Sequence, residues 1–323
     1  MEHSRSHCSR SRVGNLSFVR LHLLVFLLFF APTCAGARTC DYRVVEEATY
    51  SAFNLTALGL NGSTSIAMNG DFSGAHGRAQ SIQSFVAQSE AYVRNLAVTG
   101  IAPKVHDGVN TTDMITLDIE LPVDWKLMAR GCAGCWNDTL ASAVADALAM
   151  RIKVAHDVFP HATIALYGIT HNTKVGSASL GGYERAASLG AFDALDFMVP
   201  VLYLGPGMNA SAHTHDVLTS ASTMRTRDGR AIPMAPFLSW IYFGNGEEAR
   251  CAVPTSATLA IIAVIEALNG ELEPQPLPIP IVSFWFGSDV DTVNHTHGCA
   301  DVEPLEWLSE GIVPMSCLPS SAA

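Results

Sequence analysis

The amino-acid sequence predicts an α/β protein whose parallel strands close into a (β/α) TIM-like barrel. From residue 85 onward, short and almost uninterrupted apolar runs alternate with segments of helical spacing. Such apolar runs are typical of parallel strands that are buried on both faces. Polar and aromatic residues gather where these runs end, which is where barrels build their active sites. A doubly wound open sheet is the alternative, but no glycine-rich phosphate loop follows an early strand.

The expected elements follow one another in a regular order. Helical spacing of apolar residues predicts helices over four segments, 81–96, 138–159, 184–195 and 255–268. Apolar runs predict strands over five segments, 114–122, 163–168, 196–203, 233–242 and 280–287. Asp138 is the expected N-cap of the second helix.

The N-terminal region fits this pattern least well. If the five strands above complete the barrel, three strand–helix units should precede the Asp118 strand. Only residues 38–80 stand before the first expected helix. The sequence therefore leaves open a barrel that is incomplete, irregular at its start, or altered by an error in the gene model.

Residues 1–37 have the pattern of a secretory signal peptide. Four arginines precede an apolar run over residues 21–30, and small residues over 35–37 form a cleavage site of the A-x-A type. The run is shorter than the about 20 residues that span a bilayer. A retained signal anchor is the alternative. We expect residues 38–323 to form a single secreted, extracellular domain, with no later membrane segment and no lipid-anchor tail.

Cysteines and glycosylation sequons agree with secretion. Six cysteines lie beyond the signal and could form up to three disulfides: Cys40, Cys132, Cys135, Cys251, Cys299 and Cys317. Cys132 and Cys135 form a CxxC motif, for which we expect a structural bridge rather than redox or metal chemistry, because no second CxxC accompanies it. Six Asn-x-Ser/Thr sequons, expected on solvent-facing loops, start at Asn54, Asn61, Asn110, Asn137, Asn209 and Asn294.

Charge limits the classes of partner. The formal net charge is −11, and it becomes about −14 without residues 1–37, which carry four arginines and one glutamate. An acidic surface argues against nucleic acid and mildly against a polyanionic substrate. We expect a monomer that needs no cofactor.

The most informative residues are Asp118 and Glu120, at the end of an apolar strand. Side chains alternate along a strand, so both carboxylates point one way and Ile119 the other. Their Cα atoms should lie roughly 6.5–7 Å apart. Two like charges this close resist joint ionisation, so one carboxyl is expected to stay protonated near neutral pH. A protonated carboxyl beside an ionised one is the equipment of a glycosidase. An ordinary charged strand end, paired with a helix N-terminus or an arginine, is the alternative.

Other candidate groups give weaker signals. Two pairs of alternate histidines could chelate a metal, His213 with His215 and His295 with His297. Both pairs lie in segments that read as polar loops, and no third ligand is apparent, so no metal site is expected. Ser239 and Ser288 lack the G-x-S-x-G elbow of a serine hydrolase.

The order of the motifs resembles the hyaluronidase family of glycoside hydrolases over roughly residues 66–290. The similar segments are, in order, Met68-Asn-Gly-Asp71, the helix from Ser81, Asp118-Ile-Glu120, Tyr167 with Asn172 beyond it, Pro200-Val-Leu-Tyr203, Pro236 with Tyr242, and Trp285-Phe-Gly-Ser288. Two departures stand out. Phe286 is an extra residue in the last motif, and Leu121-Pro-Val-Asp-Trp125 replaces the family's aromatic-Arg stretch.

The resemblance implies a secreted endo-glycosidase that acts on a polysaccharide containing N-acetylhexosamine by a substrate-assisted, retaining mechanism. Glu120 would be the general acid and then the base, with Asp118 orienting and stabilising. The implied substrate contacts are aromatic, with Tyr203 at the N-acetyl group, Trp285 stacked on a sugar ring, and Tyr167 and Tyr242 nearby; core packing is the alternative for each.

Two features bear on the substrate and on the alternatives. Cationic residues are sparse around the motifs, so a neutral or chitin-like polymer fits at least as well as hyaluronan. A catalytically inactive carbohydrate-binding barrel of lectin type is the alternative to an enzyme. A surface or wall protein without any glycan affinity is a third reading.

Overall fold

The structure is a computed structural model. It describes residues 43–47, 63–67, 81–119, 123–169, 177–239, 242, 251–271, 279 and 281–285. The expected signal peptide (residues 1–37) and Glu120 lie outside the described residues.

Among the described residues, seven parallel strands form one sheet. They are β1 (Arg43–Glu47), β2 (Ser63–Ala67), β3 (Met114–Leu117), β4 (Thr163–Tyr167), β5 (Phe197–Val199), β6 (Phe237–Ser239) and β7 (Ile281–Trp285). Their order is β5-β4-β3-β2-β1-β7-β6, and every pairing is parallel. In the described part of the chain, two strands precede β3, where the expected barrel needed three strand–helix units.

Strands β5 and β6, at the two ends of this order, are each hydrogen-bonded to residues that flank the other strand. The Met198 N–H donates to Pro233 O at 3.0 Å, and the Leu202 N–H donates to Phe237 O at 2.8 Å. Parallel bridges join Met198 to Met234 and Val201 to Phe237. The backbone groups of both strands thus find partners on this side as well.

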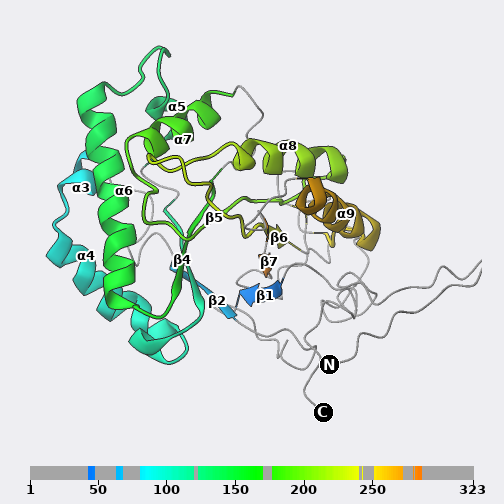
Figure 1. Ribbon diagram of the computed structural model, residues 1–323, viewed down its shortest axis with the longest axis horizontal. Coiled ribbons are helices and arrows are strands. Elements are labelled where there is room, and N and C mark those ends of the chain that lie inside the picture. The colour runs from blue at the N-terminus through cyan, green and yellow to red at the C-terminus, as the bar shows by residue number, and fades with distance from the viewer. Residues whose placement is uncertain are drawn as a thin grey trace, which may run out of the picture. The chain divides into compact units, whose positions relative to one another are not determined.

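Helices lie outside the strands in Figure 1. The α-helices are α3 (Ile82–Ala87), α4 (Glu90–Leu96), α5 (Trp125–Met128), α6 (Asp138–Val158), α7 (Ala178–Ser188), α8 (Ala210–Ser222) and α9 (Thr255–Glu271). A π-helical turn at Ala97–Ile101 and 3₁₀ turns at Ala102–Lys104 and Gly108–Asn110 lead into β3. Helix α6 packs against α3 and α4, α5 against α7, and α8 against α9. No helix in the described part of the chain has the length and apolarity to cross a membrane.

The single helix expected over 81–96 is wrong, because the chain forms two helices there. Gln88 is extended, and the Ser89 hydroxyl accepts a hydrogen bond from the Tyr92 N–H to start α4. The buried Arg151 guanidinium donates to Phe85 O at 3.2 Å and to the Gln88 side chain. These hydrogen bonds hold the C-terminal end of α3 against Arg151. Burial lowers the pKa of Arg151 to about 9.

Three other expectations about helices are corrected. The N-cap of α6 is Asn137, whose Oδ1 accepts from the Leu140 N–H at 2.9 Å, and not Asp138. Helix α7 is not 184–195 but begins at the Ser177 cap and ends at Ser188. The polar segment with His213 and His215 is no loop: it is α8, capped by Asn209. Polar composition hid α8 because more than half of its residues are Ala, Ser, Thr or His, which give weak apolar periodicity.

Buried apolar residues form two clusters, one on each side of the strands. The larger one, here the outer cluster, joins strand residues such as Ile115, Leu117, Ile164 and Leu166 to the apolar faces of the helices. The smaller one, here the inner cluster, consists of Met114, Ala165, Val199, Val201, Tyr203, Ala235 and Phe237, with Tyr167 and Phe197 packed against it. Successive residues of a strand alternate between the two clusters, as the pleat requires.

Candidate active site

The strand register brings Asp118 and Tyr167 to neighbouring positions at the carboxyl edge of the sheet. Leu117 is in register with Leu166, so the next residues, Asp118 and Tyr167, are level with each other. Tyr167 is in turn level with Val199 of β5. Parallel strands therefore deliver these residues to one edge, where barrel active sites form.

Asp118 belongs to the inner side of β3. Met114 lies in the inner cluster, and side chains two and four residues further along the extended chain point the same way. Ile119, by contrast, is 2 % exposed and packs in the outer cluster. Asp118 itself is half-buried. This carboxylate is thus held at the rim rather than in the helix layer.

Two tyrosines lie on the same inner side. The Tyr167 ring meets the Phe237 ring edge-on, with centroids 5.8 Å apart. Tyr203 is 7 % exposed and belongs to the inner cluster. Asp118, Tyr167 and Tyr203 are therefore brought to one side of the sheet from three separate strands or strand ends.

The inner side is apolar below this rim. Met114, Ala165 and Val199 are 2 % exposed or less. Thr116, between Met114 and Asp118, is fully buried, and its Oγ1 has no hydrogen-bond partner among the described residues. A rim of carboxylate and phenol groups over an apolar base is the usual make-up of a small-ligand site.

The remaining expected site residues are placed differently. Trp285 is the last residue of β7 and is in register with Ser239 of β6, so its backbone lies at the carboxyl edge. Tyr242 is half-buried against the outer cluster, and its N–H donates to Cys251 O at 2.9 Å. The structure thus does not bring Tyr242 to the tyrosines of the inner side. Glu120, two residues after Asp118, lies outside the described residues.

The connection after β3 is fixed on α7, which the sequence did not predict. Asp124 caps α5, accepting from the Lys126 and Leu127 N–H groups at 2.9 and 3.3 Å. The Trp125 ring stacks on Tyr183 of α7 with centroids 4.1 Å apart. The sequence did contain one feature that could have predicted this contact, the adjacent glycines Gly181 and Gly182. Adjacent glycines permit a close backbone approach, and here α5 packs against α7 at these two residues.

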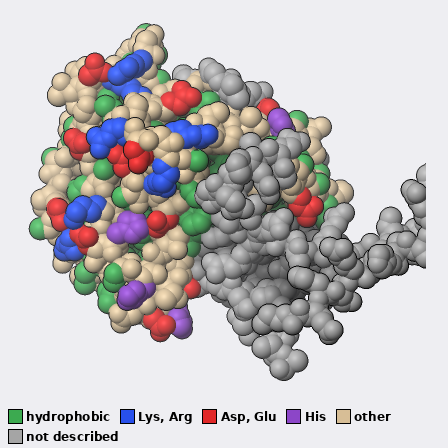
Figure 2. Space-filling model, viewed as in Figure 1, with side chains coloured by type: hydrophobic (Ala, Val, Ile, Leu, Met, Phe, Trp, Pro, Cys, Tyr) green, Lys and Arg blue, Asp and Glu red, His purple; other side chains and the backbone are tan. Residues whose placement is uncertain are grey.

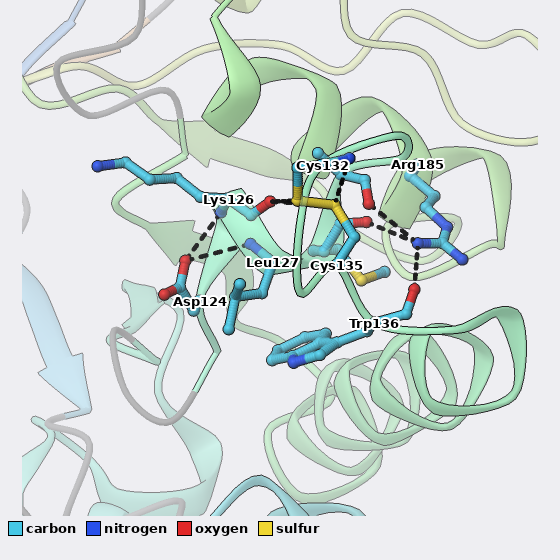
Figure 3. The surroundings of a disulfide bond; sticks show 9 residues. Asp124, Lys126, Leu127, Cys132, Cys135, Trp136 and Arg185 are labelled. Atoms are coloured by element: carbon cyan, nitrogen blue, oxygen red, sulfur yellow. Dashed lines mark hydrogen bonds between the residues drawn. A yellow bond between two sulfur atoms is a disulfide. The ribbon is translucent and has the colours of Figure 1, made fainter.

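The CxxC motif closes a small loop between α5 and α6. Cys132 and Cys135 form a disulfide with each other, a pairing that the sequence left open, with Cα atoms 5.2 Å apart (Figure 3). Cys251 is disulfide-bonded as well. The Arg185 Nη1 donates to three carbonyls at the ends of the loop, Met128 and Trp136 at 3.0 Å and Ala129 at 3.2 Å.

Arg185 also joins this loop to the start of α6. Its guanidinium is 5 % exposed and donates to the Asp138 carboxylate at 2.5 Å. A cleft of about 520 Å³ opens beside the disulfide, with Arg130, Cys132 and Glu184 on its walls. Since the carbonyls that Arg185 satisfies would otherwise lack partners, this arrangement supports a structural bridge.

The two histidines of α8 cannot share a metal ion as a pair. Residues two apart on a helix do not face each other, and His215 is exposed while His213 is half-buried. The His213 Nε2 is buried and has no partner among the described residues. Burial lowers the pKa of His213, against a smaller opposite effect of Asp216. Within the described residues, no group of three metal-ligating side chains occurs.

Charges on the described surface are mixed in sign. Figure 2 shows basic side chains lying among acidic ones on this face. Asp157, for example, binds both Lys153 and Arg94 at 2.7 Å. Hydrogen bonds lower the pKa of Asp157, the one from Lys153 most and the one from Arg94 next. This face therefore offers no uninterrupted basic surface to a polyanion.

Comparisons with known proteins show a distant likeness of fold. No family model and no curated protein matches the chain. Among solved structures, the chain is similar to bee venom hyaluronidase, with a TM-score of 0.60 and 11 % identity over 85 % of this chain and 99 % of that one. It is also similar to bee venom hyaluronidase in complex with a hyaluronic acid tetramer, with a TM-score of 0.55 and 11 % identity over 76 % and 91 %.

A GH18 chitinase from Pseudoalteromonas aurantia is more weakly similar, with a TM-score of 0.41 and 11 % identity over 66 % of this chain and 68 % of that one. The expected resemblance to hyaluronidases is thus confirmed as a distant similarity of structure.

Proposed function

We propose that this protein is an endo-glycosidase that hydrolyses a polysaccharide containing N-acetylhexosamine. One observation carries the proposal: Asp118 leaves β3 on the inner side together with Tyr167 and Tyr203, at the carboxyl edge of a parallel sheet. The similarity to the bee venom hyaluronidase fold supports a site at this edge. We also propose that the sheet closes into a barrel, since β5 and β6 are each hydrogen-bonded to residues that flank the other strand.

In the proposed mechanism, Glu120 and Asp118 divide the chemistry. Glu120 protonates the glycosidic oxygen while the acetamido carbonyl of the substrate attacks the anomeric carbon, so the glycosidic bond breaks and the leaving sugar carries the proton away. Ionised Asp118 orients and stabilises the acetamido group. Glu120 then takes a proton from water, which opens the cyclic intermediate with net retention.

Aromatic residues of the inner side hold the substrate in this proposal. Tyr203 contacts the N-acetyl group, Tyr167 lies level with Asp118 on the neighbouring strand, and Trp285 is a stacking platform at the end of β7. Aromatic faces suit the apolar face of a sugar ring. We do not extend the assignment to Tyr242, because it packs against the outer cluster.

The substrate class follows from charge. With a net charge near −14 beyond residue 37, the protein repels polyanions at long range. The mixed charges around Asp157 offer no compensating basic surface. A neutral, chitin-like polymer therefore fits at least as well as hyaluronan.

We propose secretion together with this activity. Residues 1–37 have the features of a signal peptide, and the Cys132–Cys135 disulfide suits an oxidising compartment. Sequon residues Asn110, Asn137 and Asn209 are all exposed. The Oδ1 of Asn137 and Asn209 caps a helix, which leaves the Nδ2 of each for a glycan.

One observation favours a second candidate, a catalytically inactive carbohydrate-binding barrel. The aromatic-Arg stretch expected after the carboxylates is replaced by Leu121-Pro-Val-Asp-Trp125, part of which forms the start of α5. Such a protein would bind glycans without cleaving them.

The two candidates are separated by fragment release. Wild type and Glu120→Gln are incubated with hyaluronan, chondroitin, chitin and peptidoglycan, and the products are measured by mass spectrometry. We expect the variant to lose about 100-fold or more of the activity, the scale of general acid catalysis. Glu90→Gln, an exposed residue of α4, is the matched control and keeps full activity. Binding without cleavage by wild type, unchanged in Glu120→Gln, would establish the lectin-type alternative instead.

A further inference from the structure

Tyr183 of α7 connects the two chain segments that leave β3 and β4 at the carboxyl edge. Its ring stacks on Trp125 at 4.1 Å with an interplanar angle of 27°. Its hydroxyl donates to Gly168 O at 2.6 Å. Trp125 lies five residues after Glu120, and Gly168 directly follows Tyr167. One side chain thus touches the continuation of both strands that carry proposed site residues.

The contact between α5 and α7 is close at both ends of α5. A Cβ on Gly182 would lie 1.8 Å from Trp125 O, so the backbone of α5 rests directly on α7. Phe192 meets the Trp125 ring at 6.3 Å. At the other end of α5, Arg185 donates to Met128 O at 3.0 Å. Helix α5 is therefore fixed to α7 at both ends.

The contact with the β4 continuation fixes the backbone beside Tyr167. Gly168 has φ +82°, a left-handed conformation that side chains rarely adopt. Its N–H donates to Val199 O at 3.2 Å, and its carbonyl accepts from Tyr183. Both polar backbone groups of Gly168 are thus engaged, one by β5 and one by α7, so the direction of the preceding Tyr167 is set from both sides.

Tyr183 cannot act on a substrate itself. It is 3 % exposed and its hydroxyl hydrogen is used by Gly168 O. Any effect on chemistry must therefore pass through Trp125 and Gly168, whose own positions the ring and the hydroxyl determine. Loss of the hydroxyl would leave a carbonyl at the carboxyl edge without this donor, and loss of the ring would also release α5.

We infer that Tyr183 is a positioning residue of the site: by holding Trp125 and Gly168 at once, it ties the chain segment that follows Asp118 to the one that follows Tyr167. The role rests on the proposed function, in which the Asp118 and Glu120 carboxylates and Tyr167 act on one sugar. Small displacements of reacting groups are costly, because about 1 Å of misplacement can lower turnover about 100-fold.

Kinetics of Tyr183→Phe and Tyr183→Leu test this role. The Phe variant keeps the ring on Trp125 and loses the bond to Gly168, while the Leu variant loses both. We expect kcat to fall about 10-fold in the Phe variant and about 100-fold in the Leu variant, with KM little changed. The acid limb of the pH–rate profile should also move in both, since the groups that surround the carboxylates, Tyr167 among them, influence their titration.

The control is Phe159→Leu, a fully buried aromatic residue at the end of α6 that lies in the outer cluster. It lowers stability without touching α5 or Gly168, and its pH–rate profile should keep the wild-type shape. A uniform loss of activity in the Tyr183 variants, with the profile unmoved as in the control, would show that Tyr183 is structural only.

A second readout does not depend on turnover. The carboxyl groups are labelled with ¹³C, assigned with Asp118→Asn and Glu120→Gln, and titrated by NMR in wild type and in both Tyr183 variants. We expect the midpoints of this pair to move by about half a pH unit or more in Tyr183→Leu and to stay in Phe159→Leu. Superimposed curves would overturn the positioning role. Moved midpoints in a protein that cleaves nothing would instead reject the proposed function and retain the positioning role.

Discussion

The inner and the outer side of the same strands differ in size, composition and partners. The outer cluster is continuous and almost wholly aliphatic or aromatic, and it takes residues from every α-helix for which packing is described. The inner cluster has seven buried members, two of which are aromatic. Polar groups such as Thr116, Asp118 and the Tyr167 and Tyr203 hydroxyls belong to the inner side. A step of one residue along β3 thus separates a group that stabilises the fold from one placed for chemistry.

The difference has an energetic basis. Apolar side chains between strands and helices are removed from water on all sides, and this burial stabilises by about 25 cal/mol per Å². A half-buried carboxylate such as Asp118 gains nothing from burial and needs compensating contacts. Groups that serve a reaction are therefore expected to add little stability, whereas outer residues should add much stability and no turnover.

The largest effect is expected on the outer side of β3. Ile115 is fully buried in the outer cluster. Ile115→Ala should lower the free energy of unfolding by about 2–5 kcal/mol and Ile115→Val by about 0.5–1.5 kcal/mol, because both leave a cavity of graded size. Denaturant unfolding measures the loss, and turnover is normalised to the folded fraction. A change in normalised kcat for Ile115→Val would break the division between the two sides.

A smaller free-energy effect, on activity alone, is expected on the inner side. Asp118→Asn removes the charge that stabilises the reacting acetamido group, so kcat should fall about 100-fold, or about 2.7 kcal/mol in barrier height. The thermal unfolding midpoint should stay near that of wild type. Asp146→Asn, an exposed residue of α6, is the control for loss of a carboxylate charge. Equal activities of the two variants would remove Asp118 from the proposed mechanism.

The smallest effect concerns pH and the helix layer. Because burial lowers the pKa of His213, the unfolded chain binds this proton more tightly than the folded one does. The contribution of His213 to the free energy of unfolding is therefore complete above the pKa of the unfolded chain, about 6.5. It is lost as the pH falls through the lower pKa of the folded protein.

His213→Gln should accordingly flatten the decrease in melting temperature between about pH 7 and pH 5. His215→Gln, on an exposed position of the same helix, is the matched control and should leave the curve unchanged. Identical curves for wild type and both variants would show that His213 titrates alike in the folded and unfolded chain.

Sequence patterns located most strands and the longest helices. The apolar runs at Met114–Leu117 and Thr163–Tyr167 are strands, as expected, and the α6 helix ends one residue before its expected limit. The helix predictions were wrong where the local sequence pattern and the tertiary contacts disagree. Helix α8 is polar in sequence but buries Val217 and Leu218, and α3 separates from α4 where Arg151 reaches across from α6.

The sequence by itself determined that Asp118 leaves β3 on the side opposite Ile119, because alternation is a property of the extended backbone. It also located the strands that carry Tyr167 and Trp285, but left the pairing of Cys132 with Cys135 open. Only the tertiary structure decided that Tyr167 and Tyr203 join Asp118 on the inner side while Tyr242 packs outside, and that Tyr183 holds Trp125 and Gly168 together. These outcomes depend on strand register and helix packing, which are set by contacts between residues far apart in the chain and leave no periodic signal in any one segment.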